Sequence, residues 1–503
     1  MATKKATPAA KPAPAKKPAP AAKAASAKKP APAAKAAPAK KPCAKKACCA
    51  KTVKDVKPAA IKGMKASQVH QILGKYILCD GYDIVVDTEK SHGSYMYDAK
   101  HNKEFLDFFS FFASMPIGFN HPKLHNDEFI REIGEVALHK ISNSDFYTTT
   151  MAEFVEAMAT TAKPAYMKKM FFVDGGGLAV ENALKTAFDW KMRRNLAKGI
   201  RIDEDEMKII HFKQAFHGRT GYTLSLTNTS DPWKYKYFPK FDWPRITNPK
   251  AIFPLTGENL KKTVESEKKA CQEILDACEK YGNQIAGLII EPVQGEGGDN
   301  HFRKEFIQEL RKFADKYDFL LIFDEVQAGG GLSGKWWTHE HYGVKPDIIC
   351  FGKKFQVCGI LVNDRVLAVK DNVFVKSSRL NSTWGGNIVD MKRTARYLKI
   401  IKEEKLVENA AKMGKILLEG LEALSKKTKG KIFNVRGKGL LCAFDMKDGK
   451  ARNDFINDCM NKENMIVLAC GDNSIRFRPF LDITEADVKE GLKRMERVLV
   501  GKK

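Results

Sequence analysis

The sequence predicts an α/β fold with a mostly parallel sheet, a smaller α+β domain and a low-complexity N-terminal arm. Short apolar segments alternate with helical ones in the middle of the chain, as in MKKMFFVDGGG, EMKIIHFKQAFHG, NQIAGLIIEPVQG, FLLIFDEVQ and DIICFGKK. Strands this apolar are typical of a parallel sheet that is covered by helices on both faces. Glycines and charged residues follow the ends of these segments, and in such sheets ligands bind beyond the carboxyl ends of the strands.

We expect four parts along the chain. Residues 1–65 form the arm, 66–120 an N-terminal segment that packs with the small domain, 121–386 the large domain, and 387–503 the small domain. In the large domain a helix is predicted over Lys304–Tyr317. In the small domain MGKILLEGLEALSKK predicts an amphipathic helix and GKGLLCAFDM a strand.

The arm is rich in Lys, Ala and Pro. AKKPAPAAKAA occurs at 15–25 and again at 27–37, and residues 1–66 hold 18 lysines and a single acid, Asp55. Proline removes backbone donors, like charges repel, and few large apolar side chains are present, so we expect an extended, disordered segment. Its lysines can bind nucleic acid or another polyanion in a salt-sensitive way. The alternative is a solvated arm without a dedicated partner.

From the rest of the composition we expect an intracellular protein, located in the cytoplasm. Most of the net charge of +26 lies in the arm, which argues against a nucleic-acid groove in the folded part. The 11 cysteines follow no metal-ligand spacing, so we expect reduced thiols and no metal site. No apolar run approaches the roughly 20 residues that a membrane helix needs.

A carboxylate and a lysine close two neighbouring strands. Asp324 ends LLIFD, and Lys353 or Lys354 follows the strand DIICFG. This pairing is what pyridoxal 5'-phosphate needs: the lysine binds the aldehyde as a Schiff base, and the carboxylate keeps the pyridine nitrogen protonated. Since side chains of a strand alternate between its faces, only one of the two lysines can point into the site. Spacing alone does not choose between them.

Other motifs supply the remaining contacts of such a cofactor. Asp174-Gly175-Gly176-Gly177 precedes a long helix, so Gly176 and Gly177 can bring backbone N–H groups to a phosphate. Phe216, in AFHGRT, is a candidate to stack on the ring. Arg219, three residues later, is a candidate to bind a substrate carboxylate in bidentate fashion.

Two further loops carry candidate residues. EPVQGEGGDN places Glu291 and Glu296 on a glycine-rich turn, and Glu296 is predicted to mask a cation when no acidic substrate is bound. DEVQAGGG places Val326 against the ring face and Gln327 within reach of the ring oxygen.

With AFHGRT, EPVQGEGG, FDEVQAGGG, FGKK and STWGGN in this order, the chain from about Ala66 to Val500 resembles the class III (omega) aminotransferases of fold-type I. SRLNSTWGGNIVDM, FGKKFQVCG and FFSFFASMPIGFNHP resemble the L-lysine 6-aminotransferase subgroup in particular.

The resemblance implies roles for single residues. The frame KFQVCG implies that Lys354 is the Schiff-base lysine, with Asp324 on the pyridine nitrogen. Thr383, in STWGGN, is implied to reach the phosphate of the neighbouring subunit, which predicts a homodimer. Arg219 would bind the substrate carboxylate, and Arg476, in SIRFRPF, would be the partner of Glu296, with Arg478 as a competitor.

The implied reaction moves the ε-amino group of L-lysine to 2-oxoglutarate and gives 2-aminoadipate 6-semialdehyde and L-glutamate. Two alternatives stay open. The donor can instead be 4-aminobutyrate or ornithine, within the same family. In a different class of function, the chain can act as a polyanion- or DNA-binding protein through its arm.

Overall fold

The structure, a computed structural model, describes residues 64–501. The predicted arm therefore lies outside the described residues, apart from its last two. A seven-stranded sheet has the order β4-β10-β9-β8-β7-β5-β6. Its strands are β4 (Met167–Val173), β5 (Lys208–Phe212), β6 (Arg245–Ile246), β7 (Ile285–Ile290), β8 (Leu320–Asp324), β9 (Ile348–Phe351) and β10 (Cys358–Asn363).

Six of the seven strands run in the same direction. β10 is antiparallel to both of its neighbours, β4 and β9, whereas β9, β8, β7, β5 and β6 pair in parallel. The carboxyl ends of β4, β5, β7, β8 and β9 therefore share one edge of the sheet. The predicted α/β class with a mostly parallel sheet is confirmed.

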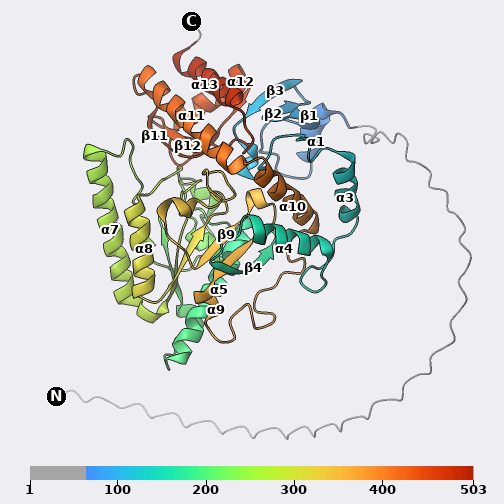
Figure 1. The fold of residues 1–503 in the computed structure, drawn as a ribbon. Coiled ribbons are helices and arrows are strands. Elements are labelled where there is room, and N and C mark those ends of the chain that lie inside the picture. Colours follow the sequence, from blue (N-terminus) through green and yellow to red (C-terminus); the bar gives the residue numbers. More distant parts are fainter. Residues whose placement is uncertain (1–63, 502–503) are drawn as a thin grey trace, which may run out of the picture. The chain divides into compact units, whose positions relative to one another are not determined.

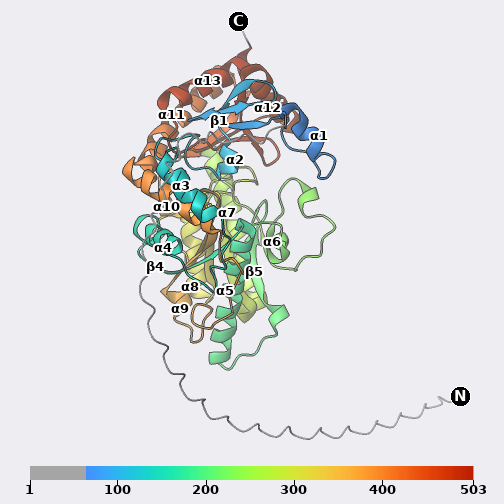
Figure 2. The same cartoon turned by 90° about the vertical axis from the view of Figure 1, so that its right-hand side faces the viewer.

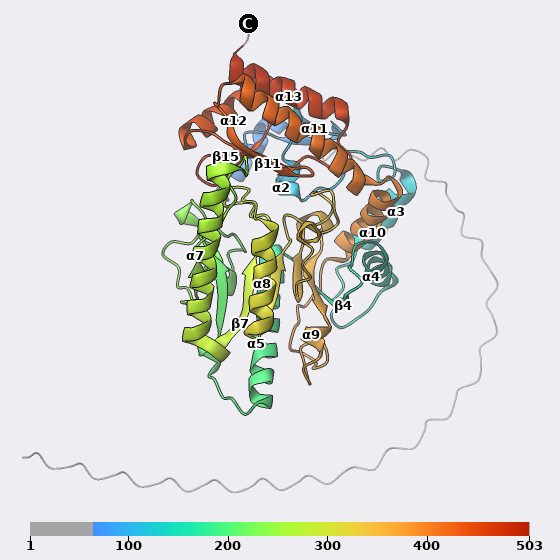
Figure 3. The same cartoon turned by 60° about the vertical axis from the view of Figure 1, so that its left-hand side comes forward.

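Helices cover both faces of this sheet, as Figure 3 shows. Along β8, Leu321 and Phe323 pack into one core with helices α7 (Gly257–Tyr281) and α8 (Lys304–Lys316). Leu320 and Ile322 pack into the opposite core with α5 (Gly176–Ala197). This alternation explains why the strand has no polar residue before Asp324.

Further helices flank the sheet and join it to the rest of the chain. They are α3 (Asp127–Ala137), α4 (Thr149–Thr161), α6 (Gly221–Leu226), α9 (Asp364–Leu367) and α10 (Ile388–Glu403). The predicted helix over Lys304–Tyr317 is α8, one residue shorter than expected.

Two smaller sheets lie above the first in Figure 1. One has the order β1-β2-β3-β13 and joins the N-terminal segment to the C-terminal part of the chain. The other has the order β11-β12-β15-β14 and packs with α11 and α13. The boundaries of the predicted domains stay predictions.

The elements of this upper part complete the fold. They are α1 (Val69–Leu73), β1 (Val86–His92), β2 (Tyr95–Asp98), β3 (Lys103–Asp107), α2 (Ser110–Ala113), α11 (Leu406–Lys427), β11 (Phe433–Lys438), β12 (Leu441–Asp445), α12 (Gly449–Glu463), β13 (Met465–Ile466), β14 (Leu468–Cys470), β15 (Ser474–Phe477) and α13 (Glu485–Val500). Within residues 64–501, no helix has the length and apolar character that crossing a membrane requires.

Candidate active site

A cavity of about 680 Å³ opens at the carboxyl edge of the central sheet. Its volume lies in the range of ordinary small-molecule sites, roughly 300–1,000 Å³. The predicted residues that line it are Gly176, Gly177, Phe216, Arg219, Glu291, Glu296, Asp324, Val326 and Gln327. These residues come from four separate loops, which meet at one space as the strand directions require.

The glycine-rich loop forms one end of the cavity. Gly175 has a φ of +102°, which favours glycine, and it precedes the first turn of α5. A side chain at Gly176 would lie only 2.8 Å from Cγ1 of Val326, so this position also has no room for a Cβ. The free N–H groups and the dipole of a 22-residue helix make this end suited to a phosphate.

The structure places the two adjacent lysines differently, and which of them binds the cofactor stays a prediction. Lys353 lines the cavity, whereas Lys354 turns away and its Nζ donates to the carbonyl of Gln327 at 2.9 Å. The reason is local: β9 ends at Phe351, and Lys353–Phe355 form a 3-10 turn in which Lys353 has a φ of +50°. The chain is no longer a strand here.

The side-chain amine of Lys353, which lines the cavity, differs from an ordinary lysine amine in its pKa. Burial, together with the positive charges of Arg476 and Arg478, lowers the pKa of Lys353 to about 8. Much of this amine is therefore neutral near pH 8, and a neutral amine is the nucleophilic form.

Asp324 is only 5% exposed and is held by a histidine that was not among the predicted site residues. Nδ1 of His217 lies 2.7 Å from Oδ2 of Asp324, and the backbone N–H of Val326 donates to Oδ1 at 3.1 Å. Nε2 of His217 is buried and has no hydrogen-bond partner among residues 64–501. His217 directly follows Phe216 in AFHGRT, so its position in that motif was the available signal.

Glu291, on the predicted glycine-rich turn, lies beside this pair. It is buried and accepts hydrogen bonds from the backbone of Phe216 and of Gly295, both at 3.0 Å. Burial raises the pKa of Glu291 to about 7, and the charge of Asp324 adds to this effect while His217 opposes it. These hydrogen bonds indicate that Glu291 stabilises the backbone of the loops that contain Phe216 and Gly295.

Glu296 forms the ion pair with Arg476 that the resemblance implies, because its Oε2 lies 2.6 Å from Nη2 of Arg476. The competitor, Arg478, is engaged elsewhere, because its Nη1 donates to Oδ2 of the buried Asp299 at 2.9 Å. Burial raises the pKa of Glu296, but the charges of Arg476 and Lys234 outweigh burial and the net pKa is lowered. Glu296 is therefore an anion in this arrangement.

Gln327 joins the two arginines to the cavity. Its Oε1 accepts from Nη1 of Arg476 and from Nη2 of Arg478, both at 3.0 Å. The amide oxygen is thus engaged. This arrangement leaves the NH₂ group as the donor that a ring oxygen would need.

The two remaining predicted residues lie apart from the buried centre. Arg219 is exposed at the rim of the cavity. Thr383 is exposed and outside the cavity, and its carbonyl accepts from the hydroxyl of Ser142 at 2.6 Å. Within one chain, the structure does not bring Thr383 to the site.

The N-terminal segment contributes a strained turn. Ser110, Phe111, Phe112 and Ala113 all have positive φ, between 38° and 63°. Left-handed backbone of this kind costs roughly 1–2 kcal/mol per residue and concentrates at functional sites. Asp107 accepts from the N–H of Ser110 at 2.9 Å and so holds the turn, which places Phe112 in the cavity wall.

Residues 79–499 match the aminotransferase class-III family. The chain therefore belongs to this family and is an aminotransferase. No group of three metal-ligating side chains occurs among the residues that the structure describes.

Individual relatives sharpen this assignment. L-lysine-epsilon aminotransferase of Mycobacterium bovis is 45% identical over 447 residues, which cover 88% of this chain and 98% of that protein. The protein of the same name in Amycolatopsis lactamdurans is 42% identical over 88% of this chain and 97% of its own length. Human mitochondrial 4-aminobutyrate aminotransferase is 34% identical, over 78% and 80% respectively.

A solved structure supports the fold. Lysine aminotransferase from M. tuberculosis in the internal aldimine form is similar with a TM-score of 0.84 and 44% identity, over 87% of this chain and 99% of that chain.

Proposed function

We propose that this aminotransferase transfers the ε-amino group of L-lysine to 2-oxoglutarate, with pyridoxal 5'-phosphate as cofactor, and releases 2-aminoadipate 6-semialdehyde and L-glutamate. The relatives named for L-lysine are 42–45% identical, against 34% for the 4-aminobutyrate enzyme. The observation that carries the proposal is the Glu296–Arg476 pair beside a cavity that also holds Lys353 and Asp324.

The residues of the cavity fit this cofactor. Gly176 and Gly177 would hold its phosphate, Phe216 and Val326 would enclose its ring, and Gln327 would donate to the ring oxygen. When bound, pyridoxal phosphate supplies an aldehyde that takes up the amino group and a cationic ring that accepts electrons. Asp324 would hold that ring cationic, and His217 fixes the carboxylate for this task.

In this proposal the central chemical role falls to Lys353, because its side chain lines the cavity, whereas the resemblance implies Lys354. Nζ of Lys353 would bond to the cofactor in the resting enzyme. Once released, the same amine takes a proton from the ε-carbon of the donor and holds it for return, as general base and then general acid. A pKa of about 8 suits both roles near neutral pH.

Two cations distinguish the substrates. L-lysine presents its distal amine, so its α-carboxylate binds far from the reaction centre, at Arg219. 2-Oxoglutarate presents its α-carbonyl and needs a second cation beside that centre, which is Arg476. Glu296 neutralises Arg476 while lysine binds and leaves it when the acceptor arrives, since a buried charge without a partner is costly.

The test is to incubate the purified protein and pyridoxal phosphate with 2-oxoglutarate and one donor at a time: L-lysine, L-ornithine or 4-aminobutyrate. Glutamate and the cyclised semialdehyde should form fastest with L-lysine. Faster turnover of either other donor would replace the proposed substrate but keep the reaction class.

A homodimer completes the proposal. Thr383 and Trp384 are exposed, and the side chain of Trp384 lies under Nζ of Lys140 at 3.7 Å. Nearby exposed aromatics, Phe146 at 70% and Tyr147 at 81%, are typical of a covered interface. Thr383 would then reach the phosphate in the neighbouring subunit. Mixing inactive Lys353→Ala with inactive Thr383→Ala protein should restore partial activity through hybrid dimers; no recovery after subunit exchange contradicts shared sites.

The arm remains a candidate polyanion-binding segment because 18 lysines precede residue 67 with one acid among them. Gel shifts of DNA by the full chain and by a chain starting near Ala66, at two salt concentrations, test this. Equal shifts would remove the arm from consideration. A cytoplasmic location also stays a prediction.

A further inference from the structure

Lys234 is a second cation at Glu296 that no motif of the sequence singled out. It ends the 3-10 helix Pro232–Lys234, in the segment between α6 and β6, and it lines the cavity. Figure 2 shows α6 and the segment after it at the side of the molecule. Nζ of Lys234 is hydrogen-bonded to Oε1 of Glu296 and lies 3.8 Å from Oδ2 of Asp231.

The two oxygens of Glu296 thus contact two different cations. Oε2 contacts Arg476, whose side chain is 1% exposed and is also held by Gln327. Oε1 contacts Lys234, whose side chain is 18% exposed. The neighbouring Trp233 is 71% exposed, so Lys234 belongs to a surface segment whereas Arg476 belongs to the core.

We propose that Lys234 is a positioning residue that keeps Glu296 paired when the carboxylate of an acceptor takes its place on Arg476. This inference rests on the proposed function and adds a residue to its substrate switch. Glu296 would turn away from the arginine and keep its contact with the lysine.

The argument follows from the cost of an unpaired charge. Glu296 is mostly buried, and a carboxylate that leaves its only counter-ion in such a place is strongly disfavoured. With Lys234 present, the carboxylate of the acceptor can replace that of Glu296 on Arg476. Both carboxylates then keep a cationic partner. Because the resting pair with Arg476 persists without Lys234, binding of the donor does not depend on this lysine.

The test is Lys234→Met, with kcat and KM measured for L-lysine and for 2-oxoglutarate. We expect the KM for 2-oxoglutarate to rise about tenfold, which is the usual size of coupling between neighbouring charges. The KM for L-lysine and kcat should stay within about twofold of the parent. Lys234→Arg should restore the KM for 2-oxoglutarate. Lys234→Gln serves as a second charge-removing variant if the Lys234→Met protein misfolds.

Lys236→Met is the matched control. Lys236 lies on the same segment, with its Nζ 5.3 Å from the ring centre of Trp233, and it does not line the cavity. This variant should leave both KM values unchanged. A rise equal to that of Lys234→Met would mean that any charge on the segment has the effect and would overturn the proposal.

The decisive comparison repeats Lys234→Met in a Glu296→Gln background. If Lys234 acts through Glu296, the second substitution should no longer change the acceptor KM. An undiminished rise in that background would mean that Lys234 binds the acceptor itself and would overturn the inference. Failure of the parent protein to transfer amino groups would instead count against the proposed function.

Discussion

Asp324 and Asp347 lie at opposite ends of neighbouring strands of the same sheet: Asp324 is at the carboxyl end of β8, and Asp347 comes just before the amino end of β9. Both are buried, at 5% and 2% exposure. Their surroundings differ, and the difference separates the part of the molecule that reacts from the part that stabilises it.

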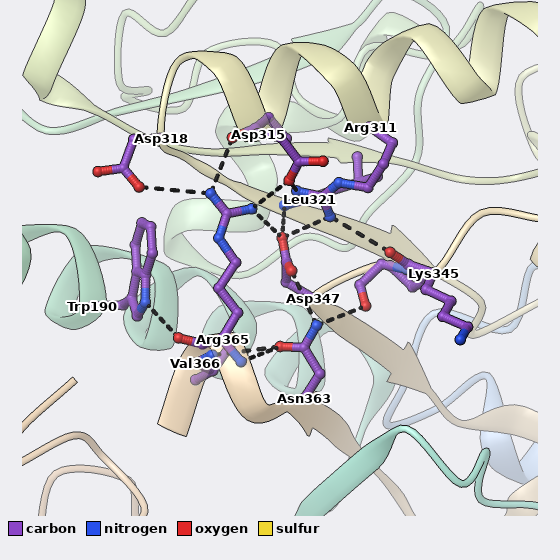
Figure 4. Close-up of polar contacts among 12 residues, drawn as sticks. Trp190, Arg311, Asp315, Asp318, Leu321, Lys345, Asp347, Asn363, Arg365 and Val366 are labelled. Atoms are coloured by element: carbon purple, nitrogen blue, oxygen red, sulfur yellow. Dashed lines mark hydrogen bonds and ion pairs between the residues drawn. The ribbon is translucent and has the colours of Figure 1, made fainter. Parts of the chain in front are cut away.

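Asp347 stands in the network that Figure 4 shows. Its Oδ2 accepts from Nη1 of Arg311 at 2.9 Å and from the N–H of Leu321 at 2.8 Å, and it also lies 3.3 Å from Nη1 of Arg365. Its Oδ1 accepts from Nδ2 of Asn363 at 3.0 Å. Protein groups occupy both oxygens of this carboxylate, which ties β8, β9, β10 and α8 together.

Asp324 has fewer protein contacts and faces a cavity. The adjacent Nε2 of His217 lacks a partner among the described residues, and Lys353 lines the same space. Buried polar groups that are incompletely paired are costly, so they persist where a ligand supplies the missing partner. The residues at the carboxyl ends of the strands are therefore arranged to bind a ligand, and those at the amino ends are arranged to stabilise the fold.

The largest expected effect separates the two adjacent lysines. Lys353→Ala should lower amino transfer by about 10⁴-fold or more, because it removes the proton-transferring amine. It should also abolish the absorption band of the bound cofactor. Lys354→Met should keep both within about tenfold, since Nζ of Lys354 donates to the backbone carbonyl of Gln327 and does not line the cavity. Loss of the band in Lys354→Met and its survival in Lys353→Ala would reverse the assignment.

The two aspartates should then respond in opposite ways. Asp324→Asn should lower kcat by roughly 10²–10³-fold, with little change in the urea midpoint, because a charge facing the reaction is lost. Asp347→Ala should lower the free energy of unfolding by about 2–3 kcal/mol, less than for a fully buried pair, because both arginines reach solvent. Its kcat per folded molecule should be unchanged. Equal stability loss in both variants would break the comparison.

Glu296→Gln should have a smaller effect, on selectivity. Arg476 would stay unneutralised during binding of the donor, so discrimination between ε- and α-amine donors should fall about tenfold while the cofactor stays bound. Donor preference is measured by competition between L-lysine and L-alanine. An unchanged preference for L-lysine over L-alanine in Glu296→Gln would contradict the proposed role of Glu296 in the substrate switch.

The smallest effect is on pH dependence. Lys353 is a protonated cation below its pKa of about 8 and a neutral nucleophile above it. The rate at which cofactor-free protein takes up pyridoxal phosphate should therefore rise with pH and level off above about 8. Stopped-flow absorbance measures this rate, with Lys354→Met as the control that should keep the midpoint. A midpoint near 10, the ordinary value for lysine, would contradict the role of burial.

Most of the site could be predicted because each motif follows a strand end. Parallel strands bring their carboxyl ends to one edge, so Asp324, Glu296, Phe216 and the glycine loop had to meet once the strands were recognised. Strand alternation left the choice between Lys353 and Lys354 open for a physical reason. Alternation between faces holds for a strand, and the lysines lie in a 3-10 turn with a left-handed residue.

Local patterns of apolar, glycine and charged residues are sufficient to predict the class of fold, the family and the set of loops that form the cavity. Three features became visible only in the folded chain: Lys353 lines the cavity, Asp299 pairs with Arg478, and Lys234 shares Glu296 with Arg476. These pairings join residues 62 to 180 positions apart, and no local pattern encodes which side chains meet across such separations.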